Sequence, residues 1–119
     1  MVNQLELEQF LFQIKEKIKV FGIVFRPRDK NLDSLAELEI SAADRVVFIS
    51  KLSVTDYYAG PKKDVVNSNR PDYYEFGLTI KRKEVYIKLS LGQTNKPVDC
   101  MSFHIAERAI NYPLKNIDR

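Results

Sequence analysis

The fold depends most on the sequence YEFGLTI (74–80), followed by EVYIKLSL (84–91) and MSFHI (101–105). In each segment the larger apolar residues alternate with polar or small ones, as in a β-strand whose successive side chains point to opposite faces. Short polar turns at 81–83 and 92–97 connect the segments. The pattern predicts three consecutive antiparallel strands, a β-meander.

The residues before the meander favour helices that pack on one of its faces. Apolar residues at positions 7, 10, 11, 14 and 18 recur at spacings of three and four, which predicts an amphipathic helix over 5–19. A short strand over 21–25 and a charged loop over 28–31 are expected next. Two further helices are predicted, one over 32–38 and one after Ser41-Ala-Ala-Asp44, which has the spacing of a capping box. Glycine, proline and polar residues predict one exposed loop over 59–72.

Length and composition are those of one folded domain. With 119 residues, 45% of them hydrophobic and 29% charged, the chain suffices for one hydrophobic core, and we assign 1–119 to a single α+β domain. No apolar run reaches the roughly 20 residues of a membrane span. The first residues also lack the pattern of a secretory signal. We therefore expect a cytoplasmic protein that does not insert into a membrane.

Single copies of cysteine and histidine limit the chemistry. Cys100 alone cannot form an internal disulfide, and one cysteine with one histidine cannot make a Cys/His zinc site, so any metal site would have to be rich in carboxylates. We predict neither a metal nor a cofactor. Cys100 itself is expected to be a small buried hydrophobe. The net charge of +3 and the pI of about 9.0 favour contact with polyanions.

Alternation along the three strands places the chemically active side chains on one face. If the larger apolar residues, Met101 included, share the core side, the opposite face presents polar groups. These are Glu75, Tyr86, Lys88, Ser102 and His104. A carboxylate, a phenol, an ammonium and an imidazole are suited to proton transfer at a phosphodiester and to offsetting its developing charge. The alternative is an ordinary solvated face with a surface histidine.

Basic residues gather in the predicted loops around this face. They are Arg26, Arg28, Lys30, Lys62, Lys63, Lys81, Arg82 and Lys83. We expect the five from Lys62 onward to contact RNA phosphates, with Arg28 a weaker candidate. The alternative is ordinary solubilising charge.

Two tyrosines, Tyr73 and Tyr86, are candidates for stacking on unpaired bases, as in proteins that bind single-stranded RNA. The other aromatic residues of this region are expected to pack in the interior. They are Tyr57, Tyr58, Tyr74 and Phe76.

Several segments resemble, in the same order, the MqsR family of toxin-antitoxin ribonucleases. Residues 36–44 with the following helix, and then Leu52-Ser-Val-Thr-Asp-Tyr-Tyr58, are similar to that family's helix and its Asp-aromatic-Tyr element. Glu84-Val-Tyr-Ile-Lys-Leu89 is similar to its Val-Tyr-Leu-Lys-Ile strand, and Met101-Ser-Phe-His104 to its closing Val-Ser-Phe-Lys strand. The resemblance extends over 5–105 and lies in the order of the segments rather than in one motif.

The resemblance implies a RelE-like fold, with N-terminal helices packed on an antiparallel meander. It also implies a toxin of a bacterial type II toxin-antitoxin system, restrained by a cognate antitoxin protein. Such a toxin is an endoribonuclease that cleaves mRNA without a metal, through attack of a ribose 2′-hydroxyl on the adjacent phosphate. The family's strand tyrosine falls on Tyr86 and its C-terminal strand lysine on His104. Its glutamine falls, after a one-residue gap, on Glu75.

The resemblance and the alternation therefore select the same catalytic candidates. We hypothesise that His104 is the general acid on the leaving 5′-oxygen, or the base in the opposite assignment. An imidazole, which ordinarily titrates near pH 6.5, donates a proton near neutral pH more readily than a lysine does. Glu75 would help to deprotonate the 2′-hydroxyl, while Tyr86 and Lys88 would orient the phosphate.

One family position differs in this chain. The family's remaining lysine falls on Ala59, and Lys62 or Lys63 is a candidate replacement. This difference keeps a second hypothesis open, a non-catalytic module that binds RNA or a protein with the same face. Substitution of His104 would distinguish the two, because a binding module would keep its affinity. A homodimer also stays open.

Overall fold

The computed structural model describes residues 2–67 and 69–115. Their backbone forms three α-helices, one 3-10 helix (η1) and five strands. In chain order these are α1 (Gln4–Phe21), β1 (Ile23–Phe25), α2 (Asp29–Leu38), α3 (Asp44–Ser50), η1 (Val54–Asp56), β2 (Tyr57–Lys62), β3 (Tyr73–Ile80), β4 (Lys83–Ser90) and β5 (Val98–Ile105).

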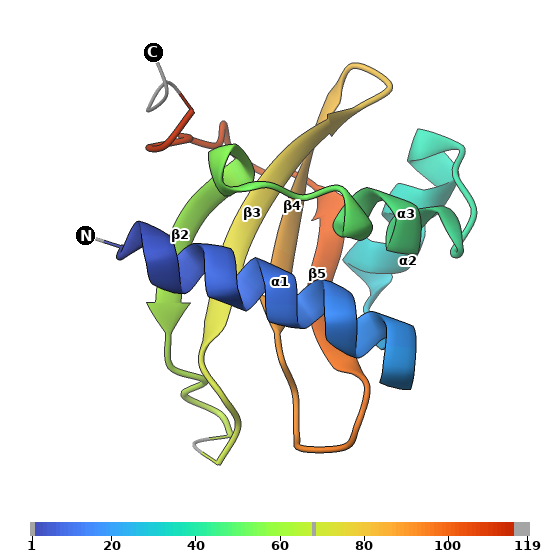
Figure 1. Cartoon of the computed structure of the whole chain (residues 1–119). Coiled ribbons are helices and arrows are strands. Elements are labelled where there is room, and N and C mark those ends of the chain that lie inside the picture. Colours follow the sequence, from blue (N-terminus) through green and yellow to red (C-terminus); the bar gives the residue numbers. More distant parts are fainter. Residues whose placement is uncertain (1, 68, 116–119) are drawn as a thin grey trace.

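The five strands form one mixed sheet in the order β1-β5-β4-β3-β2. The predicted meander is confirmed, because β3, β4 and β5 are antiparallel neighbours. β2 extends it antiparallel to β3, and β1 pairs in parallel with β5. With helices packed beside this sheet (Figure 1), the chain is an α+β protein, as the sequence predicts.

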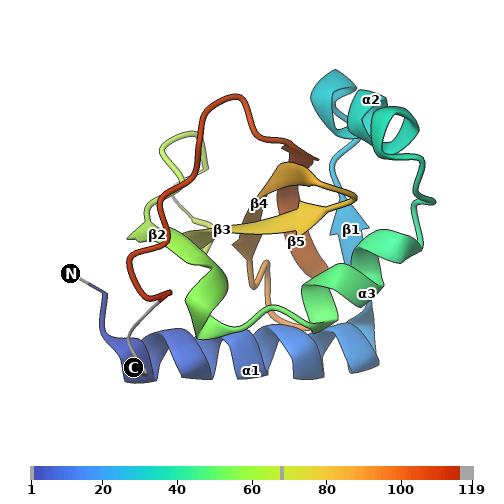
Figure 2. The same cartoon turned by 90° about the horizontal axis from the view of Figure 1, so that it is seen from above.

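α1 lies along one face of the sheet, with α3 on the same side (Figure 2). The Asn3 side chain accepts hydrogen bonds from the backbone N–H groups of Leu5 and Glu6, which satisfies the first turn of α1. Four apolar side chains of α1 are buried: Leu7, Phe10, Leu11 and Ile14. Each such burial contributes roughly 1.5–3 kcal/mol. No helix in the described residues combines the length and apolar composition that crossing a membrane requires.

The core lies between α1 and the face of the sheet toward it, which we call the inner face. Apolar side chains of the central strands fill this space. They include Phe76, Val85, Ile87, Leu89 and Phe103, none of which is more than 1% exposed. The ring of Phe10 packs on that of Tyr74 with 4.2 Å between centroids, so α1 is held directly against β3.

β5 is longer than its parallel partner, so part of its edge is covered in another way. β1 pairs only as far as Cys100. Beyond it, the N–H of Phe103 donates to Oδ1 of Asn31 at 3.1 Å, and the N–H of Ile105 donates to Oγ of Ser34 at 2.9 Å. These two buried side chains of α2 satisfy strand N–H groups that would otherwise be orphaned. α2 is thereby fixed beside the upper half of β5.

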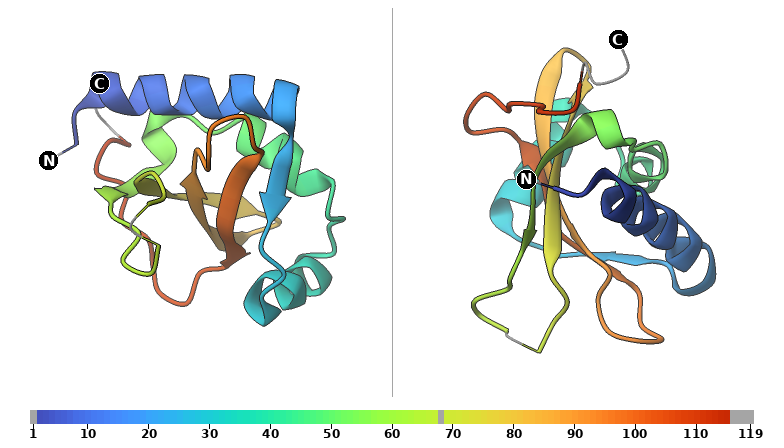
Figure 3. Two further views of the ribbon diagram at one scale, coloured as in Figure 1. Left: turned by 90° about the horizontal axis from the view of Figure 1, so that it is seen from below. Right: turned by 60° about the vertical axis from the view of Figure 1, so that its left-hand side comes forward.

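The residues after β5, which we call the C-terminal segment (106–115), cross the face of the sheet opposite α1, the outer face (Figures 2 and 3). The Glu84 carboxylate holds the segment by accepting from the Ile110 N–H at 2.8 Å and the Tyr112 hydroxyl at 3.0 Å. Tyr112 lies on Gly77, where a Cβ would be 2.4 Å from the tyrosine oxygen, so the contact depends on glycine. Leu114 then joins the core.

Two predicted loops are shorter in the structure. The charged loop expected over 28–31 is wrong, because α2 begins at Asp29. The loop expected over 59–72 begins later, since β2 continues to Lys62. Gly60 and Pro61 indicated a loop, but β2 is an edge strand, where proline is tolerated. Ser41 and Asp44 exchange the two hydrogen bonds of the predicted capping box, of 2.8 and 3.2 Å, although α3 itself begins at Asp44 with Ala43 as its N-cap.

A bulge interrupts the alternation of β5. Lys88 pairs with Ser102 whereas Leu89 pairs with Cys100, so Met101 is the extra residue. Cys100 consequently belongs to the core cluster, and Met101, although buried, does not. The expectation that Cys100 is buried is confirmed, and the expectation that Met101 faces the core is wrong.

Candidate active site

Cross-strand pairing arranges the outer face in rows. From the top of Figure 1 downward along β4, the rows across β3, β4 and β5 are Gly77-Tyr86-His104, Glu75-Lys88-Ser102 and Tyr73-Ser90-Asp99. Side chains directly opposite on neighbouring strands have Cβ atoms about 4.5–5.5 Å apart. The sheet therefore brings the four predicted catalytic residues into two adjacent rows.

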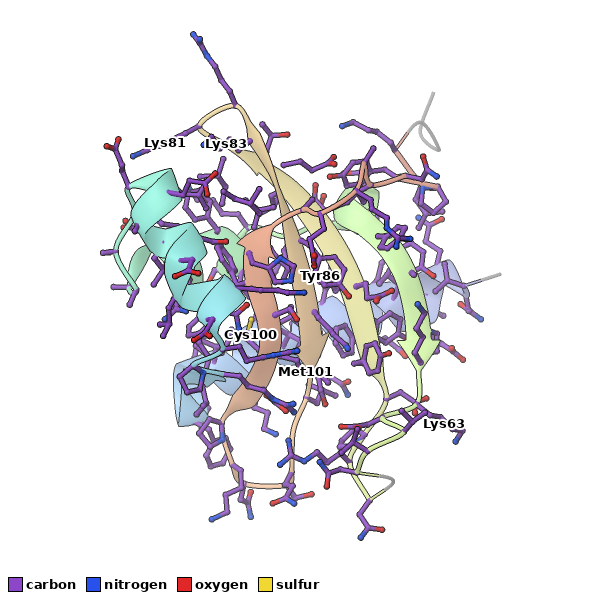
Figure 4. The ribbon with its side chains drawn as sticks, turned by 180° about the vertical axis from the view of Figure 1, so that it is seen from behind. Lys63, Lys81, Lys83, Tyr86, Cys100 and Met101 are labelled. Carbon is purple, nitrogen blue, oxygen red and sulfur yellow. The ribbon has the colours of Figure 1, made fainter. Side chains whose placement is uncertain are left out.

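A cavity of about 420 Å³ opens over these rows. Its floor is the sheet, and its walls are the start of α2, the strand β2 and the C-terminal segment. The lining residues are Arg28, Lys30, Asn31, Tyr58, Glu75, Tyr86, Lys88, Ser102, His104, Ala106, Glu107, Arg108, Ala109 and Ile110. Figure 4, turned by 180° from Figure 1, looks onto this face, with Tyr86 near its centre. All four predicted catalytic residues thus meet in one cavity.

Tyr86 and Glu75 form the central hydrogen bond of the site. The Tyr86 hydroxyl donates to Oε1 of Glu75 at 2.5 Å, and the Lys62 ammonium lies 2.9 Å from Oε2 of the same carboxylate. Burial and the bond to this carboxylate raise the pKa of the Tyr86 phenol far above its ordinary value. The hydrogen bond to Glu75 also raises the pKa of Lys62. Tyr86 is therefore neutral and Lys62 charged, and the one proton of the phenol points to Glu75.

His104 lies beside Tyr86, with 5.3 Å between the ring centroids. Its Nδ1 is 2.9 Å from the carbonyl oxygen of Ile105, which can only accept, so Nδ1 carries a proton. Nε2 is therefore the ring nitrogen left to exchange a proton. The residue is only 8% exposed, yet it lines the cavity. The imidazole is therefore largely removed from bulk water and borders the cavity.

Lys88 supplies a partly desolvated positive charge in the row next to Tyr86. Burial lowers the pKa of this ammonium, which the Glu75 carboxylate partly counteracts. Its Nζ lies 4.3 Å from the ring centroid of Tyr73, a cation–π contact that holds the side chain against the sheet. A partly desolvated ammonium interacts more strongly with an incoming phosphate than a hydrated one does.

The outer face is not an ordinary solvated surface. Glu75 is 6% exposed, Ser102 4% and His104 8%. Burial of polar and charged groups costs free energy unless partners compensate it. The alternative of a surface histidine on a solubilising face therefore does not describe this chain.

The predicted RNA-binding residues divide into two groups. Lys62 and Tyr73 do not line the cavity themselves, but they contact two residues that do, Glu75 and Lys88. Outside the cavity lining are Lys63, Lys81, Arg82 and Lys83. Figure 4 places Lys63 beside the lower loop and Lys81 and Lys83 at the opposite end of the molecule.

The hairpin lysines contact α2 and the turn after it instead. Lys81 Nζ donates to the carbonyl oxygen of Glu39 at 2.9 Å, and Lys83 forms an ion pair of 3.1 Å with Glu37. Their contact with phosphates remains a prediction.

The structure also shows the surroundings of Ala59, the position on which a lysine of the MqsR family falls. Ala59 pairs with Glu75 across β2 and β3, so a lysine there would lie in the row of Lys88. Lys62, at the end of the same strand, reaches that carboxylate. Neither lysine lines the cavity itself, but Lys62 contacts Glu75, which does, so Lys62 is the better placed of the two candidate replacements.

Other residues of the cavity were missed or misassigned from the sequence. Tyr58 was expected to pack, but it is 37% exposed and lines the cavity. The alternation of Tyr57 inward and Tyr58 outward would have indicated this, had β2 been recognised. Arg108 and Glu107 belong to the C-terminal segment, which has no periodic pattern to predict its position. Arg28, a weaker candidate from sequence, does line the cavity.

No group of three or more His, Cys, Asp or Glu side chains within 2–67 and 69–115 is placed to hold a metal ion. No protein-family profile, curated protein or solved structure matches this chain. Its function must therefore be inferred from the residues of the cavity.

Proposed function

We propose that this chain is a metal-independent endoribonuclease that cleaves single-stranded RNA in the cavity of the outer face. The observation that supports this most strongly is the pair of adjacent rows in which His104, Tyr86, Glu75 and Lys88 meet in one cavity, with Glu75 and His104 buried and Tyr86 and Lys88 half-buried. These side chains supply a proton donor, a proton acceptor and a cation, which are the groups that phosphodiester cleavage by an internal hydroxyl requires.

The substrate phosphate is bound by cations that line the cavity. Lys88 projects from the floor, Arg28 precedes α2, and Arg108 belongs to the C-terminal segment. Their positive charges offset the negative charge that grows on the phosphate oxygens in the transition state. Tyr58, which is exposed at the cavity wall, offers a ring on which an unpaired base stacks.

Attack by the ribose 2′-hydroxyl on the adjacent phosphorus forms the O2′–P bond. Because the Tyr86 proton is directed at Glu75, the phenol oxygen has lone pairs free to accept the 2′ proton as its own proton passes to the carboxylate. The P–O5′ bond breaks, and protonated His104 gives its Nε2 proton to the leaving oxygen. The products are a 2′,3′-cyclic phosphate and a 5′-hydroxyl end.

We further propose that the protein is a RelE-like, MqsR-like toxin that acts on mRNA and is restrained by a cognate antitoxin. The order of segments shared with that family supports this assignment. The helices packed beside an antiparallel meander are compatible with it. As a toxin, the chain should arrest growth when expressed in bacteria without its antitoxin.

Cleavage of a chimeric oligonucleotide with a single ribonucleotide tests the role of His104. We expect His104→Ala to lower kcat by about 10²–10⁴-fold, the usual contribution of a general acid or base. A substrate whose bridging 5′-oxygen is replaced by sulfur needs no protonation to depart, because a thiolate is a stable leaving group. On that substrate His104→Ala should lose little activity, whereas an equal loss on both would make His104 the base.

The matched control is the variant Lys51→Gln, because Lys51 is exposed and lies beyond the end of α3. This variant should cleave RNA like the wild type. Induced expression of the same three proteins in bacteria should stop growth and fragment mRNA for the wild type and the control only. If the wild type binds RNA without cleaving it, and His104→Ala binds equally, the chain is a binding module and the nuclease proposal fails.

A further inference from the structure

A second hollow of about 310 Å³ lies at the opposite end of β5 from His104. It is lined by the ends of β1 and β5, by the turn between β4 and β5, and by Arg70 from the loop before β3. Three cations line it, Arg26, Arg70 and Lys96, together with Asp99. None of the four belongs to the cavity of the proposed active site.

One carboxylate orients both guanidinium groups of this hollow. Asp99 accepts from Nε and Nη2 of Arg26 at 3.2 and 2.8 Å, and from Nη1 of Arg70 at 3.0 Å. The side chain of Asp99 is only 13% exposed, so it serves as a fixed anchor rather than as a surface group. Each arginine keeps further N–H donors free, because a guanidinium has five.

The charge balance of the hollow stays positive. Arg26 and Arg70 bond to the carboxylate of Asp99 and lie near that of Asp64, whose pKa is lowered chiefly by hydrogen bonds to backbone N–H groups, and Lys96 lines the same hollow. Lys96 has no ion-pair partner in the part of the chain that the structure describes. Three positive groups against two negative ones leave a site that attracts an anion.

The hollow continues the outer face beyond the active-site rows. Asp99 belongs to the row of Tyr73 and Ser90, directly below the row of Lys88. Asp99 and His104 pair with Ser90 and Tyr86, four residues apart on β4, which corresponds to about 13 Å at roughly 3.3 Å per strand residue. This separation is larger than a single nucleotide and suits a chain of a few nucleotides lying along β5.

We infer that this hollow is a second phosphate site, which binds the RNA backbone a few nucleotides away from the bond that is cleaved. Bidentate arginine contacts are well matched to a phosphate, and Asp99 holds the two arginines ready for it. The inference rests on the proposed function and adds to it a substrate class, a single strand long enough to reach both sites. A dinucleotide occupies the cavity alone.

The test compares Arg70→Gln/Lys96→Gln with a control that removes equal charge from the other side of the sheet, Lys19→Gln/Lys51→Gln. Affinity is measured in the His104→Ala background with a single-stranded RNA of about eight nucleotides, at several salt concentrations. The hollow variant should bind this RNA about three- to tenfold more weakly. The dependence of log K on log salt should become shallower by about 0.7, the value for one phosphate contact of a single strand.

With His104 restored, the hollow variant should cleave a dinucleotide at the wild-type rate and lose efficiency only on the longer RNA. The inference is overturned if the hollow variant and the control bind the long RNA equally, or if dinucleotide cleavage falls as much as that of the long substrate. A chain that binds long RNA through Arg70 and Lys96 but cleaves nothing would support this site and refute the nuclease proposal. Absence of RNA binding would refute both.

Discussion

The two faces of the sheet are formed by the same strands, yet the inner face buries apolar side chains and the outer face buries polar and charged ones. On the inner face, Phe10 of α1 is 6% exposed among apolar neighbours. On the outer face, Glu75 is also 6% exposed and His104 8%, among charged and polar groups. Apolar burial stabilises a fold, whereas polar burial lowers stability unless each group finds a partner. The outer face therefore indicates a requirement other than stability, and a reaction site is the one we propose.

The covers of the two faces differ as well. A regular helix of 18 residues fills the space over the inner face. The C-terminal segment, in which no helix or strand is formed between 106 and 115, crosses the outer face and leaves a cavity of about 420 Å³. It is attached by two hydrogen bonds to Glu84, by the ion pair of Glu107 with Lys30 and by the packing of Leu114 in the core. One face is thus packed and the other is kept hollow.

The largest expected difference between the two faces is in the effects of substituting two neighbouring residues of β4, one on each face. Ile87, fully buried on the inner face, should lose about 2–5 kcal/mol of unfolding free energy as Ile87→Ala, because truncation leaves a cavity. Lys88→Met keeps the length of the side chain but removes its ammonium group. Burial disfavours the charged form of this group and lowers its pKa, so the unfolding free energy of the variant should stay equal or rise. Urea unfolding and RNA cleavage, measured side by side, check both variants.

In the same assay Lys88→Met should lose most of its cleavage activity, while Ile87→Ala should keep its activity at temperatures where it is folded. Equal destabilisation by both substitutions would contradict the comparison, because the ammonium would then contribute to the fold as the core does. A Lys88→Met enzyme as active as the wild type would remove Lys88 from the proposed mechanism.

The alkaline range offers a smaller effect that is specific to the outer face. Burial, aided by the bond to Glu75, raises the pKa of Tyr86 above its ordinary value of 10.0. The folded protein therefore keeps a proton that the unfolded chain releases above pH 10, so the stability from this group is complete below pH 10 and declines above it. Above pH 10 the unfolding free energy of the wild type should therefore fall by about 1.4 kcal/mol per pH unit more than that of Tyr86→Phe.

Unfolding midpoints of the two proteins between about pH 9 and pH 11 test this difference. Tyr57, whose phenol pKa burial also raises, provides the control, since Tyr57→Phe should flatten the alkaline decline without reducing RNA cleavage. Parallel curves for the wild type and Tyr86→Phe would mean that the phenol is not protonated more strongly in the folded protein.

The sequence predicted the faces of the strands better than the parts that cover them. Alternation assigned Glu75, Tyr86, Lys88 and His104 to one face because strand geometry has a fixed period of two. The same rule failed at Met101, since a bulge adds one residue without any local signal in composition. Periodicity thus locates side chains wherever the ladder is regular.

The walls of the cavity depend on contacts between distant segments, which no local pattern encodes. Arg108 reaches the cavity because Tyr112 packs on Gly77, more than thirty positions earlier. Arg28 reaches it because Asn31 bonds to the edge of β5. The residues after β5 have no periodic pattern that would assign them to one face of the sheet.

The hairpin between β3 and β4 yields the smallest predicted effect and tests how far the outer face extends. Lys81 and Arg82 have φ of 50° and 71°, the left-handed values that a two-residue turn of this kind requires and that Asn-Gly adopts with less strain. Lys81→Asn/Arg82→Gly should therefore raise the unfolding free energy by about 0.5–1 kcal/mol, read from the urea midpoint. Because the Lys81 ammonium contacts Glu39 rather than the cavity, RNA affinity should fall less than in Arg70→Gln/Lys96→Gln. A loss as large as that of the hollow variant would instead extend the RNA surface to the hairpin, where the sequence alone had predicted it.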